Sequence, residues 1–228
     1  MGKIVLLPET TKNPLELMGI AAGSAYLSPI DNPEKNRKRG KQCVLDGHGR
    51  LLEFPTVVFD ADGYSIKVMR EVMRHVGDGL SAVQSSSRFC KFADFDYVIP
   101  PKIETMPEAK EIYVEAMSQI NEAYKSLLGL GIKQEDASGV LPLNMTTRVV
   151  MKKNARNLAD MSRVRLCNRA YHEFRDFMND LIAVLRDYSE EWNELVDIIF
   201  IPKCQELGYC NESESCGKYP KKTIDSHL

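Results

Sequence analysis

The sequence predicts an α+β fold in which a small mixed or antiparallel sheet is flanked by long helices. Short apolar alternations, typical of strands, are separated by longer stretches whose apolar residues recur every three or four positions, as in helices. A chain of 228 residues can bury a sizeable core as a single domain. We therefore assign residues 1–202 to one domain and expect residues 203–228 to form a loosely ordered, cysteine-containing tail.

The first part of the chain contains one clear strand pattern. In TVVFDAD, which begins at residue 56, every second residue is apolar, and we expect the chain to turn at Asp62 and Gly63. Upstream, the apolar run IVLL is followed by NPEKNRKRGK, residues 32–41. Proline, asparagine, glycine and clustered charge favour a solvated loop in that segment.

A helix is predicted over residues 64–75. Its apolar residues recur at steps of three and four, and Asp62 or Ser65 is positioned to cap its first turn. The sequence GDG at residues 77–79 should end it. SRFCKFADFDYVIPP, residues 87–101, is rich in aromatic residues and stops at two prolines, which predicts an extended segment.

The clearest helix of the chain follows Thr105. Thr105 and Glu108 match a capping box, and one apolar stripe continues from there. The stripe consists of Ile112, Ala116, Ile120, Ala123 and Leu127. TTRVVM, residues 146–151, predicts another strand. Residues 154–188 predict two consecutive helices, and Ser189 is expected to cap a last one.

The charge balance argues against nucleic acid or an acidic membrane as the main partner. The chain has 30 Lys and Arg residues against 32 Asp and Glu residues, a net charge of -2. No apolar stretch approaches the roughly 20 residues that a membrane-spanning helix needs. The cysteines are dispersed and the N-terminus shows no leader pattern, so we expect reduced thiols and a cytoplasmic location.

The sequence does not predict a metal site. His48 and Glu53 have the chemistry of ligands or of a base, but no second histidine stands at metal-ligand spacing. Cys204, Cys210 and Cys216 stand six positions apart, wider than the spacing of a zinc knuckle. We therefore expect no metal site.

The stretch RHVGDGLSAVQSSSRF, residues 74–89, gathers groups that suit a small anion. Hydroxyl, amide and guanidinium groups alternate along a short extended run and can converge on one ligand, and a guanidinium matches the geometry of phosphate. These groups belong to Ser81, Gln84, Ser86 and Arg88. A structural explanation stays open for Arg74 and His75, because a basic pair at a helix end often satisfies the last carbonyls.

A second group of polar residues lies in KKNARNLADMSRVRL, residues 152–166. On a helix, Asn154, Asn157 and Arg165 fall on about one face. Such a polar stripe is often solvated. The flanking apolar periodicity instead indicates a largely buried helix, and buried polar groups need hydrogen-bond partners. A ligand or a second subunit can supply them.

Taken together, these stretches resemble the flavin-dependent thymidylate synthases. The signature of that family runs Arg-His-Arg, two spacers, Ser, a spacer, Asn-Glu, a spacer, Ser, a spacer, Arg and usually Tyr. This chain has Arg74-His75 and then Ser81, Gln84, Ser86, Arg88 and Phe89. The family's upstream motif is similar to GHGRLLEFPTVVFDADGYS of this chain. Further downstream, the family has short motifs similar to VLPLN, NAR and RVRL at corresponding places. The resemblance covers residues 21–186.

Several positions depart from the family's pattern. The third signature residue, normally arginine, is Val76, and the signature Asn and Glu are Val83 and Gln84. Ser138 stands where the family usually has an arginine before its Leu-Pro, and Glu71 stands where it often has a glutamine. These changes leave flavin and nucleotide binding implied, while the identity of the pyrimidine nucleotide stays open.

The resemblance implies that the chain methylates dUMP at C5. The expected one-carbon donor is methylenetetrahydrofolate, reduced FAD donates the hydride, NADPH is the reductant, and no cysteine acts as nucleophile. It also implies a homotetramer whose active sites are shared between subunits.

The resemblance also assigns roles to residues. The catalytic residues would be Arg165, which faces the base, and Arg74, between nucleotide and flavin. The nucleotide would be bound by Gln84, Ser86, Arg88, Glu71 and Arg165, with Ser86 and Arg88 at its phosphate. The flavin would be bound by His48, Glu53, Arg74, His75 and Asn154.

Two other functions remain compatible with the sequence. One is a flavin enzyme acting on dCMP or UMP, because a carboxylate such as Glu71 favours an amino group over a carbonyl oxygen at the edge of the base. The other is a non-catalytic nucleotide- or RNA-binding relative, motivated by the altered signature and by the basic residues 35–41.

Overall fold

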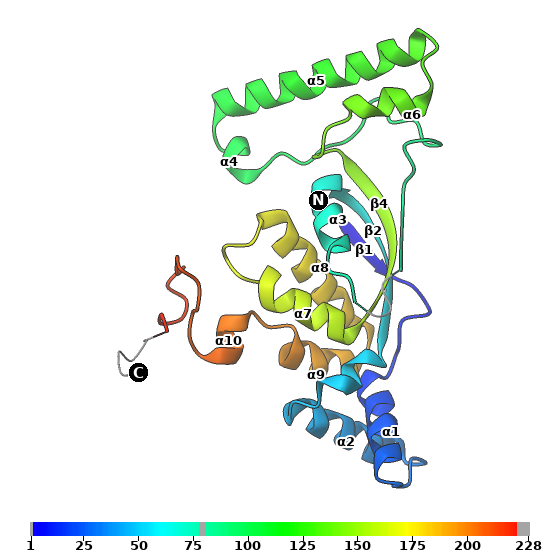
Figure 1. The fold of residues 1–228 in the computed structure, drawn as a ribbon, viewed down its shortest axis with the longest axis vertical. Helices are drawn as coiled ribbons and strands as arrows, with labels where there is room; N and C mark the ends of the chain where they lie inside the picture. The colour runs from blue at the N-terminus through cyan, green and yellow to red at the C-terminus, as the bar shows by residue number, and fades with distance from the viewer. Residues whose placement is uncertain (1, 78–80, 223–228) are drawn as a thin grey trace. The chain divides into compact units, whose positions relative to one another are not determined.

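The computed structural model describes residues 2–77 and 81–222. Within these residues the fold is α+β, with a four-stranded antiparallel sheet in the order β1-β2-β4-β3. Figure 1 labels β1, β2 and β4 of this sheet. The strands are β1 (Lys3–Leu6), β2 (Thr56–Ser65), β3 (Ser81–Gln84) and β4 (Thr146–Asn154). The predicted fold class, a small sheet with helices around it, is thereby confirmed. Asp78 and Gly79 of the predicted helix stop lie outside the described residues.

Helices make up most of the remaining regular structure. They are α1 (Pro14–Ala25), α2 (Pro33–Leu45), α3 (Ile66–Met73), α4 (Pro101–Glu104), α5 (Pro107–Gly129), α6 (Gln134–Ala137), α7 (Ala155–Arg165), α8 (His172–Tyr188), α9 (Glu190–Ile199) and α10 (Lys203–Leu207). Two short 3-10 turns, η1 (Gly49–Glu53) and η2 (Ser138–Val140), complete the set. No helix among the described residues is long and apolar enough to cross a membrane.

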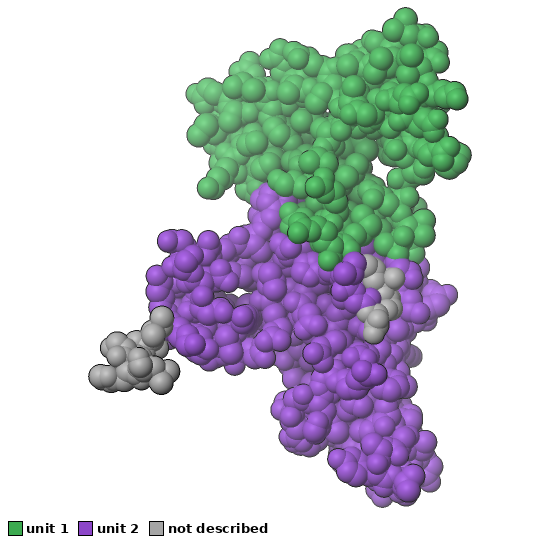
Figure 2. Space-filling model, in the orientation of Figure 1, with its two compact units in different colours: residues 1–3, 60–74, 82–150 green, residues 4–59, 75–81, 151–228 purple. Residues whose placement is uncertain are grey.

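The chain divides into two compact units, which Figure 2 colours separately. Unit 1 comprises Met1–Lys3, Asp60–Arg74 and Ala82–Val150, and unit 2 comprises Ile4–Phe59, His75–Ser81 and Met151–Leu228. The two long strands, β2 and β4, each contribute residues to both units.

The clearest sequence patterns correspond to elements of the structure. In β2 the alternating residues Val57, Phe59 and Ala61 are all fully buried, as a strand with one face in the core requires. Ser65 caps α3, because its Oγ accepts the backbone N–H of Val68 at 3.1 Å. The two helices predicted for residues 154–188 are α7 and α8, and the Oγ of Ser189 caps α9.

Helices α1 and α2 of unit 2 pack against each other through glycines. A Cβ on Gly19 would lie 1.8 Å from the backbone oxygen of Asn36, and a Cβ on Gly40 would lie 2.0 Å from that of Leu15. No side chain fits at either position. Glycine is required at both points because the two backbones themselves are in contact.

The prediction of a loop at residues 32–41 is wrong, since these residues lie largely within α2. Its cations form ion pairs with α9: Arg37 pairs with Glu190 at 2.8 Å, and Lys41 with Glu194 at 2.7 Å. Arg37 also contacts Glu194. The composition suggested a solvated loop, but contacts with two other helices stabilise the helical conformation. Helix α1 was not predicted at all.

Three local predictions also require correction. The chain does not turn at Asp62 and Gly63; β2 continues to Ser65, with Gly63 at a φ of 77°. Residues 87–100 form turns and coil, and Pro101 begins α4; this segment pairs with the start of β4 around one isolated bridge, at Tyr97. Helix α5 has Met106 as its N-cap without a side-chain cap, so the predicted capping box is not formed.

Helix α5 in unit 1 turns a different face inward from the one its stripe indicated. Met117 and Tyr124 are its buried residues, and the hydroxyl of Tyr124 accepts the N–H of Phe92 at 3.3 Å. Ile112, the first residue of the stripe, is 71% exposed. Much of the apolar surface of this helix therefore lies open within the single chain.

Candidate functional site

The predicted site residues are distributed over both units. Unit 1 contains Glu71, Arg74, Gln84, Ser86 and Arg88. Unit 2 contains His48, Glu53, His75, Asn154 and Arg165. Within each unit, some of these residues form direct contacts with one another or with a shared neighbour.

The central contact of unit 2 joins Arg165 to His75. The Nε–H of Arg165 donates to Nε2 of His75 at 3.0 Å. Arginine is always protonated and only donates, so Nε2 of this imidazole must be the unprotonated nitrogen. The last residue of α7 is thereby connected to the segment that follows α3.

Phe174 of α8 fixes the orientation of both partners. The guanidinium of Arg165 lies over its ring, with the Cζ 4.6 Å from the ring centroid. The ring of His75 meets the same phenyl group edge-on at 5.8 Å and 85°. Phe174 is fully buried and Arg165 is half-buried, so this cation–π contact is partly shielded from water. The guanidinium therefore has a defined plane as well as a defined position.

A buried lysine supports the backbone of His75. Lys153, the penultimate residue of β4, is 0% exposed. Its Nζ donates to the carbonyl oxygen of His75 at 2.9 Å and to Oδ1 of Asn157 at 2.8 Å. Burial lowers the pKa of Lys153 to about 8, because the low-dielectric surroundings disfavour the charged amine.

Asn154 and Gly77 meet the first turn of α7. Oδ1 of Asn154 accepts the N–H of Asn157 at 2.8 Å, which makes Asn154 the N-cap of that helix. A Cβ on Gly77 would lie 2.5 Å from Nδ2 of Asn157, so the segment after His75 runs close to this turn. Asn154 thus begins α7, Arg165 ends it, and His75 contacts Arg165.

His48 and Glu53 flank a separate cavity beside α7. His48 is the exposed N-cap of η1, and Glu53 forms an ion pair with Arg50 at 3.3 Å. The adjacent cavity, of about 380 Å³, is lined by residues of η1, α2, α7, α9 and α10, including Gly49 and Arg156. A Cβ on Gly49 would lie 2.2 Å from Nη1 of Arg156. Neither His48 nor Glu53 lines this cavity itself.

In unit 1, the residues around β3 already have protein partners. Nε2 of Gln84 donates to Oγ1 of Thr147 at 3.1 Å, and Oγ of Ser86 accepts the N–H of Arg88 at 3.3 Å. Nε of Arg88 pairs with Glu135 of α6 at 2.8 Å, and the Arg88 side chain is 67% exposed. A phosphate at Arg88 would therefore compete with a weak, solvent-screened ion pair.

The remaining two predicted residues lie at the end of α3. Glu71 is half-buried within the helix, and Arg74 is its exposed C-cap residue. The backbone N–H of Arg74 donates to the carbonyl of Glu71 at 3.2 Å. This contact belongs to the helix end and is independent of either side chain.

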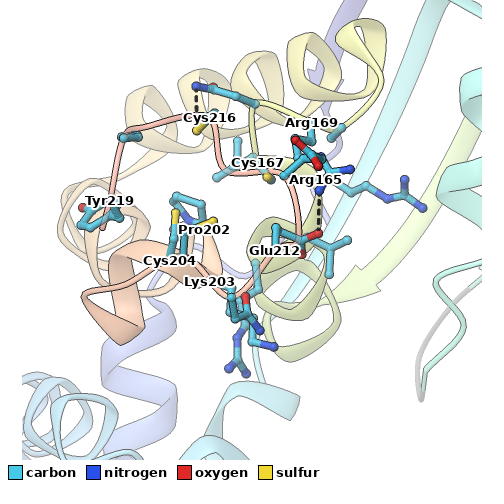
Figure 3. Close-up of a pocket in the computed structure, with 18 residues that line it drawn as sticks. Arg165, Cys167, Arg169, Pro202, Lys203, Cys204, Glu212, Cys216 and Tyr219 are labelled. Atoms are coloured by element: carbon cyan, nitrogen blue, oxygen red, sulfur yellow. Dashed lines mark hydrogen bonds and ion pairs between the residues drawn. The ribbon is translucent and has the colours of Figure 1, made fainter. Parts of the chain in front are cut away.

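A second cavity of about 380 Å³ lies beside the C-terminal end of α7 (Figure 3). Its lining includes Cys167, Cys204, Cys210 and Cys216, all of which are free thiols. Arg169 and Glu212 form an ion pair at 3.3 Å at its edge. Across residues 2–77 and 81–222, no group of three or more His, Cys, Asp or Glu side chains is arranged to hold a metal ion. The tail begins with α10, and a backbone bridge joins Cys210 to Lys221.

The sequence prediction missed Lys153, although a signal for it exists. Residues Thr147, Val149, Met151 and Lys153 occupy alternate positions of β4, and all are buried. The alternation that identifies this strand therefore places a lysine on its inward face. The contacts of Phe174 with His75 and Arg165 are not visible from spacing.

Comparisons with known proteins identify the family of this chain. The family model described as thymidylate synthase complementing protein, Thy1, matches residues 6–189. A flavin-dependent thymidylate synthase of Clostridium tetani is 29% identical over 96% of this chain and 94% of its own length. The enzyme of the same name from Pyrococcus abyssi is 30% identical over 92% and 90%. That from Thermococcus onnurineus is 29% identical over 93% and 91%.

The family model covers most of the chain, and within it lie α7, the Arg165–His75 contact and the whole sheet except the first residues of β1. The departures at Val76, Val83 and Ser138 do not prevent the match. The chain therefore belongs to the Thy1 family, the thymidylate synthase complementing proteins.

Proposed function

We propose that this protein is a flavin-dependent thymidylate synthase that methylates dUMP at C5. The observation that carries the proposal is the held guanidinium of Arg165, fixed by His75 and Phe174, in a chain that belongs to the Thy1 family. Its curated relatives carry the name flavin-dependent thymidylate synthase. That agreement favours dUMP over the other pyrimidine nucleotides.

The role we assign to Arg165 follows from where charge develops in the reaction. Adding a carbon to C5 of a uracil ring requires an electron-rich ring, in which the carbonyl oxygens and N3 carry negative charge. A cation whose plane is already fixed stabilises that charge without reorganising, and such a donor contributes on the order of 3 kcal/mol. His75 and Phe174 provide this preorganisation, because they hold Nε and the guanidinium face.

The residues of unit 2 fit a dinucleotide cofactor such as FAD. Arg156, which pairs with Asp160 at 3.4 Å, lines the cavity beside η1, and a guanidinium there suits a diphosphate. Gly49 allows this guanidinium to lie against η1, because a Cβ at that position would be 2.2 Å from Nη1. His48, Glu53 and Asn154 lie on the elements that border this region. Bound FAD would supply the hydride; the task of the protein's residues is to bind the cofactor and orient the pyrimidine.

Ser86 and Arg88 are the proposed phosphate ligands of the nucleotide, and Gln84 is proposed to bind the sugar. Support comes from their position in one continuous segment that leaves β3. Glu71 and Arg74 are proposed to complete the nucleotide side, with Arg74 also near the flavin. Glu71 remains the residue through which a different base would be selected.

The remaining features of the proposed function concern partners. We propose methylenetetrahydrofolate as one-carbon donor, NADPH as reductant, and a homotetramer with shared active sites. The exposed apolar residues of α5, such as Ile112 at 71%, support burial against another subunit. The six free thiols agree with a cytoplasmic location, where cysteines stay reduced.

The RNA-binding alternative loses its main support. The basic segment that motivated it is α2, and two of its cations, Arg37 and Lys41, are engaged by carboxylates of α9. The carboxylates of α9 lower the positive charge that this helix offers to a phosphate backbone.

A complementation experiment tests the proposal directly. The gene is expressed in a bacterial strain that lacks thymidylate synthase, and growth is scored without thymidine. We expect growth with the wild-type chain and none with Arg165→Ala. In parallel, purified protein is assayed for conversion of dUMP to dTMP with FAD, methylenetetrahydrofolate and NADPH. Absence of growth together with absence of flavin absorbance in the purified protein contradicts the proposal.

A further inference from the structure

A fully buried lysine without a carboxylate partner is rare, because burial of an amine must be compensated by hydrogen bonds. Lys153 is 0% exposed, and the structure gives it two acceptors, the carbonyl of His75 and Oδ1 of Asn157. No ion pair involves Lys153 in the described part of the chain. Electrostatic stability therefore does not explain why a lysine occupies this inward position of β4.

The two acceptors explain what the amine does. One is the backbone of His75, and the other is the side chain of Asn157 in the first turn of α7. Two N–H groups of the Lys153 amine donate to these two acceptors. The lysine thus links the His75 segment to the start of α7, while the imidazole of His75 meets Arg165 at the end of the same helix.

We propose that Lys153 is a positioning residue that holds His75 in place and, through His75, sets the orientation of Arg165. The chain of contacts runs from Lys153 Nζ to the His75 carbonyl at 2.9 Å, and from His75 Nε2 to Arg165 Nε at 3.0 Å. Removing the lysine takes away the donor that Nζ provides to the His75 carbonyl, so the segment that positions the imidazole against the guanidinium loses this support. The consequence for nucleotide binding rests on the proposed function, whereas the link between Lys153 and His75 does not.

The first test measures the His75 ring without using activity. Lys153→Met keeps the length of the side chain and removes its donors, and Lys152→Met is the matched control, because Lys152 is the exposed neighbour on the same strand. Hydrogen–deuterium exchange at the imidazole C2 is followed by mass spectrometry of histidine-containing peptides; the chain has only 4 histidines. The exposed His48 serves as internal reference.

We expect exchange at His75 to accelerate several-fold in Lys153→Met, with His48 unchanged and with no acceleration in Lys152→Met. Unaltered exchange at His75 overturns the proposal. Lys153→Gln, which keeps an NH2 donor on a shorter side chain, is the second variant and should lie between wild type and Lys153→Met. Circular dichroism verifies that each variant is folded, and if Lys153→Met does not fold, the Lys153→Gln result decides.

The second test asks whether the effect passes through Arg165. Binding of dUMP is measured calorimetrically for wild type, Lys153→Met, Arg165→Ala and the double variant. We expect Lys153→Met to weaken binding about tenfold, the equivalent of one charge-assisted hydrogen bond, and to have little further effect when Arg165 is already alanine. If Lys153→Met weakens dUMP binding equally in the wild type and in Arg165→Ala, the effect does not pass through Arg165 and this part of the proposal is wrong. Absence of dUMP binding to the wild type contradicts the proposed function alone, and the exchange result still decides the role of Lys153.

Discussion

Arg165 donates through Nε to Nε2 of His75 at 3.0 Å, across a sequence separation of 90 positions. The bond makes the imidazole an acceptor and leaves the orientation of the guanidinium dependent on a residue of another segment. The end of α7 is thereby joined to the segment after α3, and Lys153 at the end of β4 donates to the carbonyl of the same His75.

Arg165→Ala should reduce turnover more than it reduces nucleotide binding. The charge of Arg165 matters most when the pyrimidine ring becomes anionic, so the loss appears mainly in kcat, at about a hundredfold or more. Steady-state kinetics with dUMP provide the measurement. Arg169→Ala is the matched control, because Arg169 is a nearby exposed arginine paired with Glu212 at 3.3 Å. A variant with unchanged kcat and raised KM would assign Arg165 to uniform binding instead.

Arg88→Ala should weaken nucleotide binding by about 1.5 to 3 kcal/mol, the range for a hydrogen bond to a charged group. The contact between Arg88 and Glu135 adds a second expectation: Glu135→Gln should strengthen binding modestly, since the competing carboxylate charge is gone and the exposed pair is worth at most about 1 kcal/mol. Calorimetric titration with dUMP, UMP and dCMP measures both variants. Lys91→Ala, an exposed cation of the same segment, controls for general charge. Tighter binding of UMP or dCMP than of dUMP would overturn the choice of substrate.

Asn154→Leu should yield folded protein with little or no bound flavin. The substitution removes a buried polar group and the N-cap of α7, and the lost cap alone costs about 1 kcal/mol of stability. Asn154→Ser separates the two effects, because a serine hydroxyl can cap the helix without reproducing the amide. The visible absorbance of purified protein reports flavin content. Equal flavin content in the wild type and Asn154→Leu would place the flavin elsewhere.

The pKa of Lys153, lowered by burial to about 8 from an ordinary 10.5, predicts a pH dependence of stability. Between these two values the unfolded chain binds more protons than the folded one, so the free energy of unfolding rises with pH. Below about pH 8 the full cost of burying the charge is present, on the order of 3 kcal/mol. Urea unfolding between pH 7.5 and 10 should therefore show the wild type gaining stability relative to Lys153→Met. Lys152→Met should follow the wild type, and parallel curves for all three proteins would contradict the buried, depressed amine.

The sequence predicted those elements whose periodicity is complete within a short window. Val57, Phe59 and Ala61 mark β2 because each alternates onto the same buried face. Ser65 and Ser189 were recognised as caps because capping is local, between a hydroxyl and an N–H three residues later. The presence of His75 and Arg165 in one site came from resemblance to a family, since their spacing of 90 residues carries no local signal.

The incorrect predictions concern features that depend on distant contacts. Residues 32–41 have the composition of a loop, yet α2 forms because Gly40 allows it to contact the backbone of α1 and because Glu194 of α9 pairs with its cations. Residues 87–101 have the composition of a strand. A strand forms only where a neighbouring strand pairs with it over several residues, and here the pairing is one isolated bridge at Tyr97. Lys153 was missed because a lysine is ordinarily assigned to the surface, although the alternation of β4 places this one on the inward face.

The ion pairs between α2 and α9 change how this molecule should respond to salt. A protein that binds a polyanion releases counterions from it, and its affinity falls steeply as salt rises. Arg37 and Lys41 are already paired with the fixed carboxylates of Glu190 and Glu194, so these two cations contribute little to the release of counterions from a polyanion. Two of the five cations at residues 35–41 are thus neutralised, in the folded chain, by carboxylates of another helix.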